Sequence, residues 1–291
     1  MTKLLTIVIP VYKVEEYINK CLDSLILTPE LMDKMDVLII NDGTPDNSAE
    51  LSREYVKKYP TVFRQIDKEN GGHGSVWNMG VKEAYGKYTR FLDSDDLWIE
   101  SKVETQIKMM IENGWQISHT SYMTKDIDTG EVNERLVGKA NYDLAKVIQC
   151  CQIATPTVRI KKSVLQSSNL FRSDFRAGED CCAWIDLAER FVIYGIEKPM
   201  TIVRVTTTTT ARNPKALTVG IGNIIQHALQ KKYSGFYIKE ITPLLNAYVH
   251  GAHSLNVRLD EPVRAEVASE MVQESVQKPR GIRAWLKRKV K

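Results

Sequence analysis

Short apolar segments alternate with amphipathic segments through the first hundred residues, and this order limits the folds open to the chain. Four stretches rich in β-branched and other apolar residues are expected to form strands, at residues 4–9, 37–40, 62–66 and 88–92. The residues between them carry apolar side chains at helical spacing, in the ranges 15–26, 48–59 and 76–85. Pro10 is expected to end the first strand, because proline cannot donate to a sheet ladder. The alternation predicts an α/β fold with a mainly parallel sheet and helices on both faces.

After residue 100, the predicted strands and helices no longer alternate regularly. Further helices are expected at residues 102–112 and 180–194, further strands at 117–123, 158–164 and 202–208, and mostly helix from residue 217 onward. A chain of 291 residues has room for one large domain or two modest ones. We therefore predict one α/β domain over residues 1–210, divided into 1–98 and 99–210, followed by a helical C-terminal region over 211–291.

Positive charge is concentrated at the C-terminal end. The net charge is +4, yet residues 278–291 hold seven basic residues and no acid, so the rest of the chain is net negative. A nucleic-acid-binding protein would more often spread positive charge over one face of its fold, so no nucleic-acid partner is expected. Within the tail, Ile282, Trp285, Leu286 and Val290 fall on one face of a helix and basic residues on the other. This pattern suits an anionic membrane surface, and a solvated tail or a helix packed through Trp285 is the alternative.

Cellular location is inferred from what the sequence lacks. It has no apolar run of the roughly 18–20 residues that a membrane span needs, and no signal-peptide pattern at its start. Its five cysteines show no disulfide-like ladder. We predict a cytoplasmic protein, which the basic tail would bring to the inner face of the cell membrane.

Polar and glycine-rich segments follow each of the four predicted strands. In parallel sheets, ligands bind outside the carboxyl ends of the strands, so these segments are expected to share one edge of the sheet. They are residues 10–12, 41–44, 67–74 and 93–96. The sequence therefore predicts a ligand site at this edge.

Two of these segments carry distinctive chemistry. The carboxylates of Asp93 and Asp95 offer the hard oxygen ligands that Mg²⁺ or Mn²⁺ prefers, and the alternative is an acidic turn that caps a helix near Trp98. Asp42 would accept a hydrogen bond from a base or ribose, or else form a simple turn with Gly43. Residues 70–75 place three glycines before a helix start, where backbone amides can meet a phosphate, although neither a dinucleotide fingerprint nor a Walker loop is present. His73 in this stretch is interpreted as a solvated residue without a role.

Taken together, these segments resemble the family 2 glycosyltransferases, which have a Rossmann-like GT-A fold. The resemblance is carried by Thr6–Tyr12, Val37–Thr44, Asn70–Tyr88 and Phe91–Asp96, and it covers residues 4–98. Further along, Gly178-Glu179-Asp180 ahead of a helix resembles the Glu-Asp motif of the family. The resemblance implies an enzyme that transfers a sugar from a nucleotide diphosphate sugar with inversion at the anomeric carbon. Residues 1–98 would bind the donor and 99–210 the acceptor.

The resemblance also implies roles for individual donor-binding residues. Asp42 would bind the uracil of a UDP-sugar, with Pro10 and Tyr12 forming that end of the pocket. Asp93 would contact the ribose or a metal-bound water. The donor-binding set is completed by Asn70, Asn78 and Ser94.

The remaining implied roles concern the metal and the base. Asp95 would be the direct ligand of Mn²⁺ or Mg²⁺, whose charge offsets that of the departing diphosphate. Asp180 would be the general base that deprotonates the acceptor hydroxyl, although an acidic pair at a helix N-terminus is also favourable through the helix dipole alone.

The sequence departs from the family pattern at one informative place. Val76-Trp77-Asn78 stands where many members have Ala-Arg-Asn, so Trp77 replaces a basic residue often near the donor. No Gln-x-x-Arg-Trp segment is present, which argues against a processive polymer synthase. We expect transfer of one sugar per encounter to a glycan, glycolipid or glycoprotein acceptor, in bacterial surface polysaccharide synthesis. The alternatives are a non-catalytic scaffold that binds nucleotide sugar or lipid, and a sugar-nucleotide pyrophosphorylase, which would need a basic glycine-rich loop after the first strand.

Overall fold

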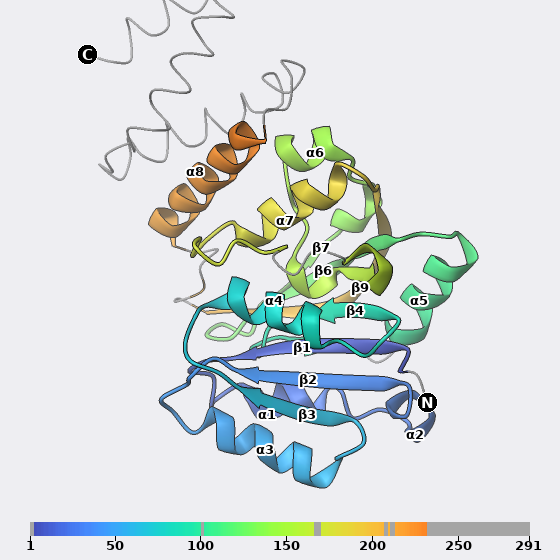
Figure 1. The fold of residues 1–291 in the computed structure, drawn as a ribbon, viewed down its shortest axis with the longest axis vertical. Helices are drawn as coiled ribbons and strands as arrows, with labels where there is room; N and C mark the ends of the chain where they lie inside the picture. The colour runs from blue at the N-terminus through green and yellow to red at the C-terminus, as the bar shows by residue number, and fades with distance from the viewer. Residues whose placement is uncertain (1–2, 100–101, 166–169, 207–208, 210–212, 232–291) are drawn as a thin grey trace, which may run out of the picture.

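The computed structural model describes residues 3–99, 102–165, 170–206, 209 and 213–231. Nine strands form one sheet in the order β3-β2-β1-β4-β8-β6-β9-β5, with β7 beside β6 (Figure 1). No helix in these ranges is both long and apolar enough to cross a bilayer. The basic tail at residues 278–291 and its predicted membrane contact lie outside the described residues.

The N-terminal half of the sheet is parallel, as the alternation of strands and helices predicts. Its strands are β1 (Leu5–Val11), β2 (Met35–Asn41), β3 (Phe63–Asp67) and β4 (Tyr88–Phe91). The helices between them are α1 (Ile18–Asp23), the short α2 (Pro29–Met32), α3 (Ser48–Lys58) and α4 (His73–Glu83). All three pairings among these four strands are parallel, so their carboxyl ends share one edge.

The second half is mixed. Its strands are β5 (Leu97–Trp98), β6 (Ile117–Asp126), β7 (Val132–Arg135), β8 (Arg159–Lys161) and β9 (Ile193–Val205). Its helices are α5 (Lys102–Glu112), α6 (Leu144–Gln149), α7 (Glu179–Ala188) and α8 (Pro214–Gln230), with 3₁₀ turns at Val137–Lys139, Thr155–Thr157 and Lys162–Val164. β8 runs antiparallel between β4 and β6, whereas β9 is parallel to β6. The sheet therefore continues across residue 98, and the division of the chain at residues 98 and 210 stays a prediction.

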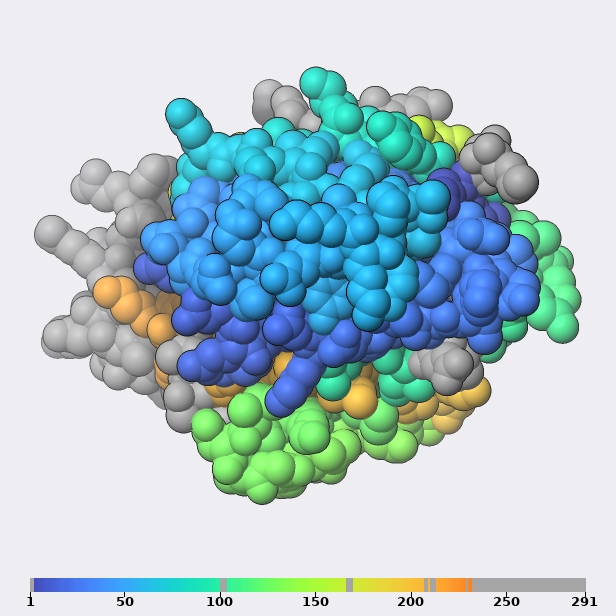
Figure 2. All heavy atoms as spheres, turned by 90° about the horizontal axis from the view of Figure 1, so that it is seen from below, coloured from blue at the N-terminus to red at the C-terminus, as the bar shows by residue number. Residues whose placement is uncertain are grey.

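Helices cover both faces of the sheet because alternate residues of its strands point to opposite sides. On β1, Val8 packs with α4 in one core, whereas Ile7 and Ile9 pack with α1 in the other. Figure 2 views the molecule from below, where the N-terminal segments, coloured blue, make up the centre of the surface. The α/β class with helices on both faces is confirmed.

Several predicted boundaries are wrong. β1 continues through Pro10 to Val11, because β1 pairs with β4 only as far as Val8 and the missing N–H breaks no ladder there. The predicted helix at 180–194 ends at Ala188, and residues from Ile193 onward are strand β9. Residues near Trp98 form strand β5 against β9 instead of starting a helix.

Candidate active site

Asp42 organises the donor edge of the sheet. It follows β2 directly, and its buried carboxylate accepts hydrogen bonds from the backbone N–H groups of Gly71 (2.9 Å) and Gly72 (2.8 Å). The Lys68 ammonium lies 2.5 Å from Asp42 Oδ1, and the Asn70 amide donates to both the backbone carbonyl and the carboxylate of Asp42. In this structure, Asp42 therefore holds the glycine-rich loop in place.

Pro10 and Tyr12 lie at the end of the neighbouring strand. Pro10 is buried within β1, whereas the Tyr12 ring is 39% exposed, with the Lys13 ammonium 5.4 Å from its centroid. A flat, exposed aromatic ring at the carboxyl end of a strand is suited to stack on a nucleobase.

The acidic loop after β4, residues 93–96, is held by Arg204 of strand β9. Within the loop, the Asp96 N–H donates to the Asp93 carbonyl (2.9 Å). Arg204 on β9 donates its backbone N–H to Asp96 Oδ1 (2.9 Å) and its guanidinium to the carbonyls of Asp95 and Tyr17. Asp96 and Arg204 therefore fix the conformation of the loop that carries Asp93 and Asp95.

The electrostatics of this loop favour a cation. Burial, together with the charges of Asp95 and Asp180, raises the pKa of Asp93 to about 8. Asp93 Oδ1 is buried and has no hydrogen-bond partner in the part of the chain that the structure describes. Burial also raises the pKa of Asp95, while Arg204 and His73 oppose that shift. Ser94 between them is buried. A divalent ion would relieve the repulsion and satisfy the orphaned oxygen.

The residues therefore fit Mn²⁺ or Mg²⁺, although they do not form a complete site alone. Among the described residues, no group of three or more His, Cys, Asp or Glu side chains is arranged to hold a metal. Such ions keep several ligand positions for water and substrate phosphate. Asp95 and Asp93 are the side chains that would hold the ion.

Asp180 lies at the start of α7, close to the acidic loop. Its carboxylate accepts hydrogen bonds from Thr155 Oγ1 (3.0 Å) and from the Cys181 N–H (2.7 Å). Burial raises the pKa of Asp180, and these two hydrogen bonds oppose the shift. Glu179 is 8% exposed, and burial and the charge of Asp180 raise its pKa too. The carboxyl of Asp180 is thus oriented by two donors, as a positioned base must be.

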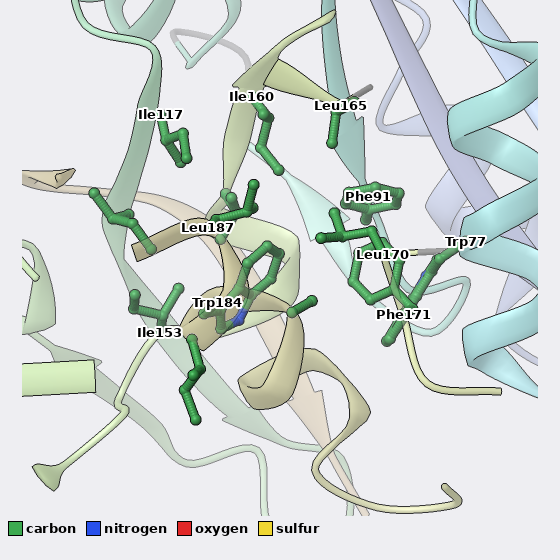
Figure 3. Packing of buried hydrophobic residues seen from close by; sticks show 14 of the residues in the cluster. Trp77, Phe91, Ile117, Ile153, Ile160, Leu165, Leu170, Phe171, Trp184 and Leu187 are labelled. Carbon is green, nitrogen blue, oxygen red and sulfur yellow. The ribbon is translucent and has the colours of Figure 1, made fainter. Parts of the chain in front are cut away.

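Asn78 and Trp77 have positions that the sequence does not indicate. The Asn78 amide pairs with the Phe171 backbone, donating to its carbonyl (2.7 Å) and accepting from its N–H (2.9 Å). Trp77 is buried, with its ring centroid 5.0 Å from that of Phe171 and 6.0 Å from that of Phe91. Figure 3 shows the three rings packed together in the core. Trp77 is therefore a core residue, and its replacement of a basic residue does not put an indole in the donor site.

Asp95 and Asp180 both act electrostatically on Asp93, and Asn70 pairs with Asp42 in the glycine-rich loop. Two further residues lie at this loop: His73, which the sequence indicates as a solvated residue without a role and which is exposed, and Arg176, which no sequence pattern singles out. His73 acts electrostatically on Asp95, Glu179 and Asp180, and Arg176 lies against Gly72. The glycine-rich stretch was a signal for His73, whereas nothing in the sequence links position 176 to position 72.

Comparison with known proteins identifies the class. The model of glycosyl transferase family 2 matches residues 6–163, which is more than half of the chain. The chain belongs to this family.

Similar sequences come from several bacteria. An uncharacterised glycosyltransferase of Rickettsia felis is 36% identical over 231 residues, which are 78% of this chain and 37% of that protein. The glycosyltransferase GlyA of Streptococcus pneumoniae is 33% identical over 140 residues, or 48% of this chain and 20% of GlyA. The minor teichoic acid biosynthesis protein GgaB of Bacillus subtilis is 29% identical over 184 residues, or 60% of this chain and 20% of GgaB. The chain thus spans about a third of the length of the Rickettsia relative that it matches.

Solved structures share the fold. A TarS fragment from S. aureus in complex with UDP-GlcNAc aligns with a TM-score of 0.67 at 18% identity, covering 89% of this chain and 77% of that one. The mannosyltransferase PcManGT from Pyrobaculum calidifontis, in complex with GDP-Man and Mn²⁺, aligns with a TM-score of 0.60 at 14% identity, covering 98% and 83%. The expected GT-A fold is confirmed.

Proposed function

We propose that this chain transfers one sugar from a UDP-sugar to a hydroxyl of a glycan, glycolipid or glycoprotein acceptor, with inversion, in bacterial surface polysaccharide synthesis. The observation that carries the proposal is the electrostatic interaction of the buried Asp93 with Asp180, at the sheet edge where Asp42 holds the glycine-rich loop. Nucleoside, diphosphate and acceptor would then occupy successive positions along one edge of the sheet. The relatives and solved neighbours support this class of donor and pathway through the names and ligands given above.

The reaction follows from the positions of the carboxylates. The acceptor oxygen would attack the anomeric carbon while its proton passes to the Asp180 carboxylate. The bond from that carbon to the diphosphate oxygen breaks, and its electron pair leaves with UDP. A single displacement of this kind inverts the configuration at the carbon. Mn²⁺ or Mg²⁺, held by Asp95 and Asp93, would offset the charge that develops on the leaving group.

Donor contacts form the remaining part of the proposal. Tyr12 would stack on the uracil, with Pro10 shaping the pocket and Asn70 and Ser94 completing the wall, and Asp42 would support this end of the pocket through the loop that its carboxylate holds. Asn78 enters the proposal as the residue that holds the segment at Phe171, because its amide is already paired there. A cytoplasmic enzyme at the inner face of the cell membrane would meet lipid-linked acceptors.

The test is release of UDP from a panel of UDP-sugars by the purified chain with Mn²⁺, comparing wild type with Asp180→Asn. General-base catalysis is typically worth about 10²-fold or more, so the variant should lose at least that in turnover while binding UDP normally. Glu189→Gln, at the far end of α7, is the matched control and should keep wild-type turnover.

Two results would change the proposal. If Asp180→Asn keeps most of its turnover, the base is elsewhere, and Glu179 is the next candidate. If the wild type binds UDP-sugars and releases no UDP from any of them, the non-catalytic scaffold is the better description. Formation of a sugar nucleotide from a sugar phosphate and UTP would indicate a pyrophosphorylase.

A further inference from the structure

The segment from Phe171 to Arg176 crosses directly over the first turns of α4. A Cβ atom added at Gly74 would lie 2.7 Å from the Arg172 carbonyl oxygen, so only glycine permits this approach. At Gly72, an added Cβ would collide with Nη1 of Arg176, and the backbone there has φ +80°, which L-residues rarely adopt. The Arg176 guanidinium therefore lies on the bare backbone of Gly72.

Arg176 has unused donors in this position. Its side chain is exposed and forms no hydrogen bond or ion pair with any residue that the structure describes. Arg172, four residues earlier, differs because both arms of its guanidinium donate to the Asp174 carboxylate (2.8 and 2.6 Å). The planar fork of an arginine matches the oxygens of a phosphate, which it binds through two parallel hydrogen bonds.

His73 is the second donor side chain at this place. It is exposed at the first position of α4, and its ring centroid is 5.5 Å from that of Trp77. It follows Gly72 directly in the chain, next to the backbone that the Arg176 guanidinium contacts. His73 and Arg176 therefore present two exposed donor side chains at the same point, the start of α4 at Gly72.

We propose that Arg176 and His73 bind the diphosphate of the donor nucleotide. This inference rests on the proposed function, which puts the nucleoside at Asp42 and the transferred sugar near Asp180. The diphosphate between them would pass Gly72, where Arg176 lies, and then His73. Both side chains donate hydrogen bonds to phosphate oxygens, and those bonds strengthen as the electron pair of the broken bond settles on the leaving oxygen. No proton transfer is required of either residue.

The experiment compares the affinities of UDP and UMP by calorimetry in the presence of Mn²⁺. The ratio of the two dissociation constants reports the contribution of the second phosphate and cancels effects on the uracil end. In Arg176→Ala, the preference for UDP should shrink about tenfold, which corresponds to about 1.4 kcal/mol. His73→Gln should shrink it less, and Arg176→Lys should recover part of the loss because the charge returns without the fork.

Arg172→Ala is the control, since it removes an equal charge from the same segment. Its ratio of UDP to UMP affinity should match wild type. Melting temperatures of all variants verify folding. A wild-type ratio in folded Arg176→Ala overturns the inference.

Inorganic pyrophosphate keeps this inference separate from the choice of UDP as donor. If the wild type shows no preference for UDP over UMP, the proposed donor fails. Pyrophosphate binding then decides the present inference. If Arg176→Ala binds pyrophosphate about tenfold more weakly than wild type, the inference is supported. If the two proteins bind it equally, or if the wild type does not bind it, the inference is overturned.

Discussion

Replacing Asn78 with alanine should destabilise the protein strongly, because its amide satisfies two backbone groups at once. The Phe171 N–H and carbonyl both pair with Asn78, and Phe171 is 1% exposed. A buried donor or acceptor left without a partner costs about 1–3 kcal/mol. Two such groups, with some relief from water entering the space of the amide, give a loss of about 2–4 kcal/mol in the free energy of unfolding.

The loss can be read as a melting temperature. In a domain of this size, 1 kcal/mol moves the melting temperature by roughly 2–4 °C, so Asn78→Ala should lower it by about 5–15 °C. Asn133→Ala is the matched control, because Asn133 lies on the exposed strand β7 and its amide donates only to Glu131. Its stability should change by less than about 0.5 kcal/mol.

Nucleotide binding separates this role from a donor contact at Asn78. Below the melting transition, folded Asn78→Ala should bind UDP within a few-fold of wild type. A melting temperature within about 2 °C of wild type, combined with a tenfold loss of UDP affinity, would refute the reasoning and make Asn78 a donor ligand.

Three further predictions concern the metal, acid stability and the tail. UDP should bind more tightly with Mn²⁺ than in EDTA, and Asp95→Asn should remove that difference; equal affinity in both conditions would exclude a metal role for Asp95. Burial raises the pKa of Asp186, but hydrogen bonds from His227 and Lys231 outweigh it and hold the pKa below its ordinary value of 3.8. A carboxyl whose pKa is lower in the folded than in the unfolded protein stabilises the fold above its unfolded-state pKa, and this stabilisation is lost as the pH falls through its folded-state pKa. Asp186→Asn should therefore lower the melting temperature more at about pH 7 than at about pH 3. If the basic tail binds membranes, where each basic residue contributes about 1 kcal/mol, truncation after Gln277 should abolish salt-sensitive co-sedimentation with anionic vesicles; absence of binding by the full chain at low salt would contradict it.

Local sequence patterns predict the parallel half of the fold well. The apolar runs before Pro10, Asn41 and Asp93 are buried strands, because a strand covered on both faces has no polar alternation to obscure it. Their ends share an edge as a consequence of parallel topology, which is why Asp42 and Asp93 could be predicted as neighbours of one site.

The second half depends on contacts between distant residues. β9 pairs with β6 across a sequence separation of nearly eighty residues, from Ile117↔Ile193 to Asp126↔Val205. The helical spacing that ends at Phe191 gives no sign of the strand that starts at Ile193. α4 begins at His73, three residues before the predicted start. Glycine has a low helix propensity, so Gly72 and Gly74 favour a loop in the sequence; in the structure they are needed because residues 172–176 pack against their backbone. The position of Arg176 against Gly72 depends on the same packing, and no periodicity encodes it.

The crossing of residues 171–176 over α4 has a consequence for engineering hybrid enzymes. Three residues that precede the acidic loop contact residues about a hundred positions later in the chain. They are Gly72 and Gly74, which pack against Arg176 and Arg172, and Asn78, which is hydrogen-bonded to Phe171. A chimera that keeps residues 1–98 and takes its second half from a relative would join surfaces that were never matched. Such grafts should retain activity only when the first turns of α4 and the 171–176 segment are exchanged as a pair.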